Sequence, residues 1–227
     1  MGQFIELTAS DGHKLAAYVA APGGANAGKP RGGVVVAPEI FGINAHIQAV
    51  ADGFAADGFH AVAPAFFDRA QRNYDTGYSQ PEIQAGVAIM QKLDQGKTLL
   101  DVDAAVAEAK KGGKVGIVGY CYGGTVAWLA AARTAGLACA VPYYGGGMFG
   151  LIKEQPKVPV MCNFGETDHS PTLEQAKAIV AAHPEITAHF YPNAGHGFNC
   201  DHRASYNAEA AKLARQRTIE FFHKHLG

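Results

Sequence analysis

Short apolar runs alternate with longer amphipathic segments along most of the chain, and this alternation predicts its secondary structure. Continuous apolar runs predict buried strands at residues 33–37, 59–63, 114–118, 138–142, 158–163 and 187–191. Segments with helical spacing predict helices at residues 44–57, 81–93, 97–110, 125–132, from 171 onwards and at 204–224. Alternating strands and helices predict an α/β fold with a mostly parallel, doubly wound sheet that has helices on both faces.

The amino-terminal part departs from this alternation. Residues 3–7 and 14–20 predict two strands joined at Asp11-Gly12, a dipeptide typical of tight hairpin turns. The Gly-, Ala- and Pro-rich stretch 21–29 predicts a surface loop. Residues 64–80 predict a long aromatic and charged loop, and loops of that length are typically functional.

Overall composition narrows the class of protein. Of the 227 residues, 48% are hydrophobic and 17% are charged, which indicates a chain that folds around a buried core. Because no repeat, low-complexity tract or linker interrupts it, we expect a single domain over residues 1–227. A formal net charge of -1 offers no electrostatic basis for binding nucleic acid or an anionic membrane.

Targeting signals and cysteine spacing are consistent with a cytoplasmic protein. The first six residues lack the basic and apolar regions of a secretory signal, and no apolar run is long enough to cross a bilayer. The four cysteines, Cys121, Cys139, Cys162 and Cys200, have no C-x-x-C spacing, which argues against a zinc or thioredoxin-type site. We therefore expect reduced cysteines in the cytoplasm.

The stretch Gly119-Tyr120-Cys121-Tyr122-Gly123-Gly124 is the strongest chemical signal in the sequence. It separates a predicted strand from a predicted helix and matches the nucleophile elbow G-x-S-x-G, with cysteine in place of serine. Cys121 would then lie in a strained turn at the positive end of a helix dipole, where a thiolate is favoured. The alternative is a glycine-rich junction around a buried free cysteine.

Further polar residues directly follow predicted strands. The carboxyl ends of parallel strands form the usual ligand site of an α/β sheet, and the residues found there include Glu39, Tyr144, Asp168 and His196. The order of nucleophile, acid and histidine matches the triad of α/β-hydrolases. We therefore interpret Cys121 as nucleophile, His196 as its base and Asp168 as the carboxylate that orients the base.

Several neighbouring residues could take these roles instead. His169 or His202 could be the base, and Cys200 could be a rival nucleophile, although it lacks an elbow. The histidines, Asp168 and Cys200 have no metal-ligand spacing such as H-E-x-x-H, so no metal site is predicted.

Four segments together resemble the dienelactone hydrolase family of α/β-hydrolases. They are Pro38-Glu39-Ile40-Phe41-Gly42, the cysteine elbow at 119–124, Tyr143-Tyr144-Gly145 and Ala194-Gly195-His196-Gly197-Phe198. The similarity extends over nearly the whole chain, in order and with compatible lengths.

This resemblance implies an α/β-hydrolase that opens an enol-lactone, converting dienelactone to maleylacetate during the degradation of chlorinated aromatics. Cys121 would form an acyl-enzyme, and the backbone N–H groups of Ile40 and Tyr122 would form the oxyanion hole. In the family, the glutamate that matches Glu39 takes the thiol proton when substrate arrives. No cofactor is implied.

The resemblance also implies contacts to substrate by Tyr144, Phe41, Arg203 and Arg72. Family members hold the substrate carboxylate with two arginines, but this chain has Cys200 at the position expected for the second, and Arg203 follows three residues later. For the first arginine, the preceding loop offers Arg69 and Arg72. We expect a monomer that acts on a small lactone or ester.

Other functions remain open at this stage. The same mechanism would serve a small-molecule carboxylesterase or thioesterase with a different substrate. A protein of this fold could also bind a ligand without catalysis, since fold does not dictate function. A redox-sensing role for Cys121 is weakened because no resolving cysteine lies nearby in the sequence.

Overall fold

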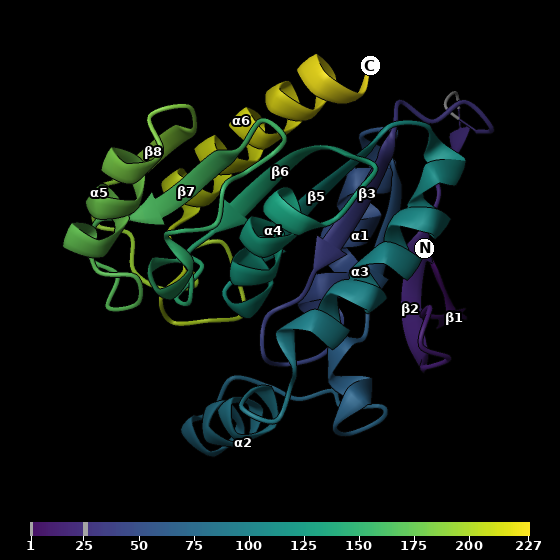
Figure 1. Cartoon of the computed structure of the whole chain (residues 1–227), viewed down its shortest axis with the longest axis horizontal. Helices are drawn as coiled ribbons and strands as arrows, with labels where there is room; N and C mark the ends of the chain where they lie inside the picture. Colours follow the sequence, from purple (N-terminus) through teal and green to yellow (C-terminus); the bar gives the residue numbers. More distant parts are fainter. Residues whose placement is uncertain (1, 25–26) are drawn as a thin grey trace.

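An eight-stranded sheet in the order β1-β2-β4-β3-β5-β6-β7-β8 forms the centre of the computed structural model, which describes residues 2–24 and 27–227 (Figure 1). The strands are β1 (Gln3–Thr8), β2 (Lys14–Ala20), β3 (Gly33–Ala37), β4 (His60–Pro64), β5 (Val115–Tyr120), β6 (Leu137–Tyr143), β7 (Met161–Gly165) and β8 (Thr187–Tyr191). The β1–β2 and β2–β4 pairs are antiparallel, and every neighbouring pair from β4 to β8 is parallel.

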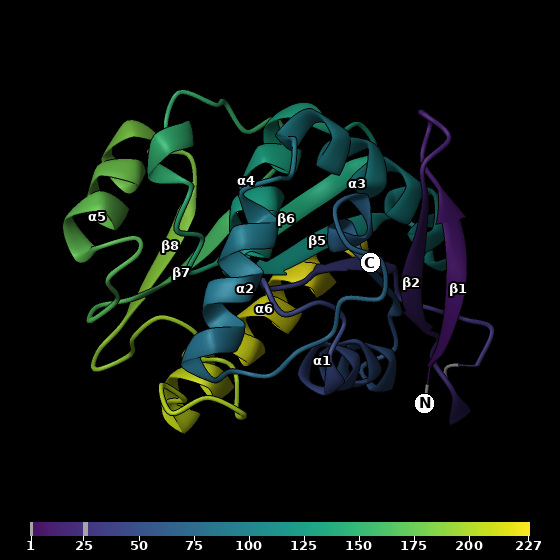
Figure 2. The ribbon, with the colours of Figure 1, turned by 90° about the horizontal axis from the view of Figure 1, so that it is seen from below.

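Helices cover both faces of this sheet. They are α1 (Ala45–Ala56), α2 (Gln80–Met90), α3 (Gln95–Ala109), α4 (Tyr122–Arg133), α5 (Leu173–Ala182) and α6 (Ala208–Leu226). In Figure 2, α1 and α6 lie on one side of the sheet and α3, α4 and α5 on the other. The central strands are buried along their whole length because helices pack on both of their faces.

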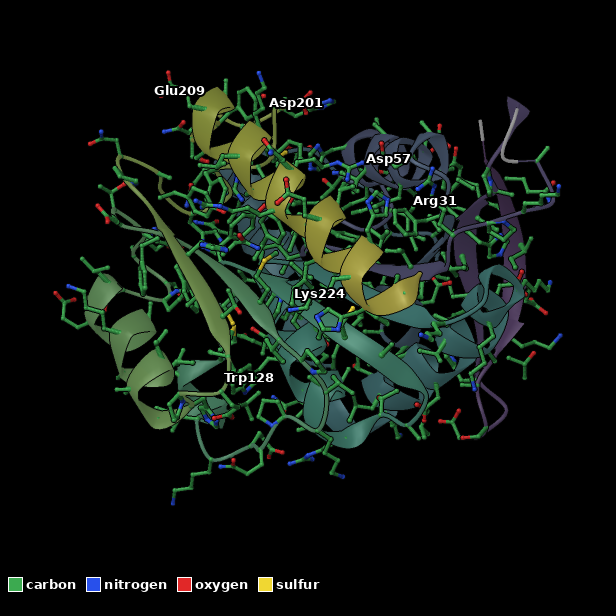
Figure 3. All side chains as sticks on the ribbon, turned by 90° about the horizontal axis from the view of Figure 1, so that it is seen from above. Arg31, Asp57, Trp128, Asp201, Glu209 and Lys224 are labelled. Carbon is green, nitrogen blue, oxygen red and sulfur yellow. The ribbon has the colours of Figure 1, made fainter. Side chains whose placement is uncertain are left out.

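Each face has its own apolar core. Leu99, Val102 and Trp128 belong to the cluster under α3, α4 and α5. Phe54 and Phe222 belong to the cluster under α1 and α6, where their rings lie 5.8 Å apart. Figure 3 shows Trp128 and α6 on opposite sides of the sheet. The predicted doubly wound α/β architecture is confirmed.

Several predicted boundaries differ from the structure. The strand predicted at 158–163 is β7 at Met161–Gly165, because Pro159 has no N–H to donate to a strand ladder. The helix predicted at 204–224 begins at Ala208, where the Asn207 side chain accepts from the Ala210 amide at 3.1 Å.

The two predicted loops also have a more specific outcome. The loop predicted at 64–80 contains a short 3-10 helix, η2 (Phe66–Arg69), whose Arg69 is held by the buried Asp101. The surface loop predicted at 21–29 falls partly outside the described residues. Over the two described ranges, none of the helices combines the length and the apolar character that a membrane crossing requires.

The turn between β5 and α4 brings the helix unusually close to the sheet. A Cβ added at Gly119 would lie 1.9 Å from the Gly123 carbonyl oxygen, and one at Gly123 would lie 2.0 Å from the Ala37 carbonyl oxygen. Both contacts are with backbone, which cannot rotate away as a side chain can. Positions 119 and 123 therefore have to be glycine for α4 to begin immediately after β5.

We expect Gly119→Ala to lower the free energy of unfolding by about 1–3 kcal/mol, because the new methyl group overlaps backbone atoms. Urea denaturation would measure this change. Gly150→Ala is the matched control, since a Cβ at Gly150 meets no atom of the described residues within 4 Å. Equal stabilities of the two variants would contradict the close approach described above.

Candidate active site

Cys121 lies in the tight turn between β5 and α4, at the carboxyl end of a central strand. Its φ of +55° is in the left-handed region, which is strained for a residue with a Cβ. The Cys121 amide donates to the Tyr143 carbonyl oxygen at 3.1 Å. Since α4 begins at Tyr122, the half-buried thiol lies at the positive end of the α4 dipole. The structure thus has the strand, turn and helix that the elbow pattern predicts.

His196 and Asp168 come together from the loops that follow β8 and β7. His196 Nδ1 lies 3.2 Å from each carboxylate oxygen of Asp168, and both side chains are largely buried. Asp168 Oδ1 also accepts from the Ser170 amide at 2.7 Å, which fixes the orientation of the carboxylate. This contact holds the imidazole with Nδ1 toward the acid and leaves Nε2 for another partner.

The protonation of His196 is set by two opposing effects. Burial by itself lowers the pKa of His196, but the charge of an adjacent Cys121 thiolate and the Asp168 carboxylate raise it to about 10. His196 is therefore favoured as an imidazolium when Cys121 is deprotonated, and its positive charge stabilises the thiolate in return.

The alternatives for base and nucleophile are less well placed. His169 has an 81% exposed side chain, and its Nδ1 is 3.9 Å from Asp168. His202 lies beside Asp201 at 3.8 Å and does not line the cavity that contains Cys121. Cys200 is completely buried, and burial together with the Glu39 charge raises the pKa of its thiol to about 11. Geometry thus favours Cys121 and His196 for these roles.

Glu39 is almost completely buried at the end of β3, with 1% of its surface exposed. Arg203 Nη1 donates to Glu39 Oε1 at 3.3 Å, and the guanidinium lies over the Phe41 ring at 5.6 Å. The second oxygen, Oε2, has no hydrogen-bond partner within the described part of the chain. Arg203 therefore neutralises a buried carboxylate while it also lines the cavity.

A cavity of about 670 Å³ opens in front of Cys121 and His196. Ile40, Phe41 and Tyr122 line it beside Cys121. As the first residue of α4, Tyr122 has an amide with no partner inside the helix, which leaves this N–H available to a ligand.

The other wall of this cavity comes from α2, whose role the sequence did not indicate. Ile83, Val87 and Met90 of α2 line the cavity. In Figure 1, α2 lies apart from the helices that cover the faces of the sheet. In the sequence, Ile83, Val87 and Met90 follow one another at intervals of four and three residues, which forms an apolar stripe along one face of a helix. Such a stripe alone does not show which surface it faces.

Two residues predicted to contact substrate lie elsewhere. Tyr144 is fully buried behind the site, with its ring 5.3 Å from the His196 ring, and it does not line the cavity. Arg72 has a 56% exposed side chain that lies 4.0 Å from Glu6, outside the cavity. This geometry does not support substrate contacts by either residue. Arg72 lies outside the cavity because the 64–80 segment directs its side chain toward Glu6 of β1.

The comparisons with known proteins all indicate the same protein family. The sequence model of the dienelactone hydrolase family matches residues 15–226. The carboxymethylenebutenolidase of Pseudomonas putida is 32% identical to this chain, over 96% of this chain and 94% of its own length. An Azospirillum brasilense protein, provisionally named a carboxymethylenebutenolidase, is 35% identical over 98% of this chain and 99% of its own length.

A solved structure extends this similarity to three dimensions. A Klebsiella pneumoniae protein, provisionally named a dienelactone hydrolase, superposes with a TM-score of 0.83 at 28% identity, over 97% of this chain and 98% of its own. Together with the match over most of the chain, these similarities show that this protein belongs to the dienelactone hydrolase family.

Proposed function

We propose that this protein hydrolyses an enol-lactone, opening dienelactone to maleylacetate, with Cys121 as the nucleophile. The observation that carries the proposal is the placement of Cys121 in an elbow turn, in a cavity that it shares with the Asp168-bound His196. The name of the Pseudomonas putida relative, carboxymethylenebutenolidase, supports the same reaction.

The proposed reaction has two steps. The Cys121 thiolate attacks the lactone carbonyl, and the N–H groups of Ile40 and Tyr122 stabilise the resulting oxyanion. The ring C–O bond then breaks, which leaves a thioester on Cys121 and an enolate that takes the proton of the His196 imidazolium, so that the ring becomes neutral. Water, deprotonated by His196, cleaves the thioester and restores the thiol, so that one water is consumed per lactone. These steps need no cofactor.

Glu39 and Arg203 would couple substrate binding to activation of the thiol. Arg203 lines the cavity and contacts Glu39, so a substrate carboxylate would compete with Glu39 for the guanidinium. A Glu39 carboxylate released from Arg203 becomes a stronger base for the Cys121 proton. We place this reaction in the cytoplasmic degradation of chlorinated aromatic compounds, carried out by a monomer.

A carboxylesterase or thioesterase with a larger apolar substrate is the second candidate. The apolar wall of Ile83, Val87 and Met90 favours it, because a small charged lactone offers little surface to pack against these side chains. The two candidates share Cys121 and differ in their need for Arg203.

We expect Cys121→Ala to lower kcat/KM by at least about 1000-fold, because the thioester cannot form without the sulfur. Steady-state hydrolysis of cis- and trans-dienelactone and of p-nitrophenyl acetate measures this loss. Cys139→Ala is the control, since Cys139 is buried in β6 outside the cavity. Substantial turnover by Cys121→Ala would rule out this nucleophile.

The His196 ring should titrate near pH 10 in the wild-type protein. In Cys121→Ala the pKa of His196 should fall, because the thiolate that stabilises the imidazolium is gone while burial still disfavours it. NMR titration of the ring protons, assigned by comparison with His196→Gln, measures both values. A titration that is unchanged by Cys121→Ala would show that the two groups are not coupled.

Arg203→Met should reduce kcat/KM for dienelactone at least about tenfold more than for p-nitrophenyl acetate, because only the lactone carries a carboxylate. The ratio of the two kcat/KM values is the readout, since loss of the Glu39 contact affects both reactions. Arg72→Met, with its exposed side chain outside the cavity, should leave this ratio unchanged. An equal loss with both substrates would favour the second candidate.

A further inference from the structure

A cluster of metal-ligating side chains lies beside the candidate active site. Glu39, His46 and Cys200 are all buried, and one potential ligand atom of each lies within 4.8 Å of those of the other two. They come from three distant segments: the turn after β3, the first turn of α1 and the loop beyond His196. Because no spacing motif connects these segments, the sequence did not predict the cluster.

Two atoms of this cluster lack a hydrogen-bond partner. Glu39 Oε2 and His46 Nε2 are buried, and no group in residues 2–24 or 27–227 pairs with either. The other atom of each side chain is occupied: Arg203 donates to Glu39 Oε1, and His46 Nδ1 lies 3.1 Å from Asp201 Oδ1. A buried polar atom without a partner is energetically unfavourable, so a ligand bound to these two atoms would be stabilised.

The contact with Asp201 leaves one nitrogen of His46 for a ligand. His46 Nδ1 is directed at Asp201 Oδ1, so Nε2 is the nitrogen that remains. Glu39 Oε2 is likewise the oxygen to which Arg203 does not donate. A cation between them satisfies both atoms. Figure 3 shows Asp201 close to α6, in the loop that precedes this helix, where it lies at the protein surface.

We propose that Glu39, His46 and Cys200 bind one divalent transition-metal ion of the zinc class. Sulfur, nitrogen and oxygen ligands together suit zinc, whereas calcium and magnesium require oxygen alone. The contact of Asp201 with His46 is the arrangement that orients histidine ligands in zinc sites. Three protein ligands leave a fourth position for water.

Binding requires a small contraction of the cluster. Zinc bonds of about 2.0–2.3 Å place tetrahedral ligand atoms roughly 3.5 Å apart, which side-chain rotation within the present 4.8 Å spread can reach. The Cys200 thiol loses its proton to solvent when its sulfur coordinates the ion, so one proton is released per metal bound.

An ion at this site would inhibit hydrolysis, a consequence that rests on the proposed function. Coordination of Glu39 removes the carboxylate that would take the Cys121 proton, because a carboxylate bound to a cation is a weaker base. Zinc is therefore expected to act as a reversible inhibitor that a chelator removes.

Calorimetric titration of the 227-residue chain with Zn²⁺, without substrate, tests the site directly. We expect one equivalent in the wild type and in Cys121→Ala, and at least about tenfold weaker binding in Cys200→Ser and His46→Gln. Co²⁺ should give a thiolate charge-transfer band in the first two proteins and lose it in Cys200→Ser. Circular dichroism establishes that each variant is folded.

The Cys121→Ala variant separates this site from zinc capture by the nucleophile. Zinc binding that disappears in Cys121→Ala would overturn the proposal, as would full affinity in both Cys200→Ser and His46→Gln or no binding to the wild type. Since binding is measured without substrate, the result does not depend on whether the protein hydrolyses dienelactone.

Discussion

The close contact of α4 with β3 and β5 is the constraint on which the rest of the site depends. Gly119 and Gly123 allow backbone atoms to approach where a methyl group could not fit. That approach places Cys121 at positive φ and exposes its sulfur at the start of a helix. Two other loops then bring His196, held by Asp168, to the same cavity, because parallel strands end at the same edge of the sheet.

Charge balance in a buried environment links the parts of this site. His196 has the Asp168 carboxylate on one side and Cys121 on the other, and the negative charge of these groups stabilises its positive charge despite burial. Glu39 is buried with Arg203 as its cation, and one of its oxygens has no partner among the residues that the structure describes. A buried carboxylate with an incomplete set of partners is poised to respond to a new charge, whether this comes from a substrate or from a metal ion.

The two walls of the cavity supply different chemical groups. The sheet side supplies the reacting groups and the backbone amides, whereas α2 supplies the apolar side chains Ile83, Val87 and Met90. Since α2 lies apart from the helices that cover the sheet, its sequence can vary with less effect on the core than that of α4 (Figure 1). Substrate preference within this fold can therefore change while the reacting groups stay in place.

Local patterns in the sequence were enough to predict the alternating strands and helices, the Cys121 turn and the residues at the strand ends, because each depends on neighbours along the chain. Only the tertiary structure decided that Arg203 pairs with Glu39, that Arg72 and Tyr144 lie outside the cavity and that α2 forms its wall. It also brought Glu39, His46 and Cys200 together. Contacts between distant segments depend on how helices and loops pack over the sheet, and spacing along the chain does not encode that packing.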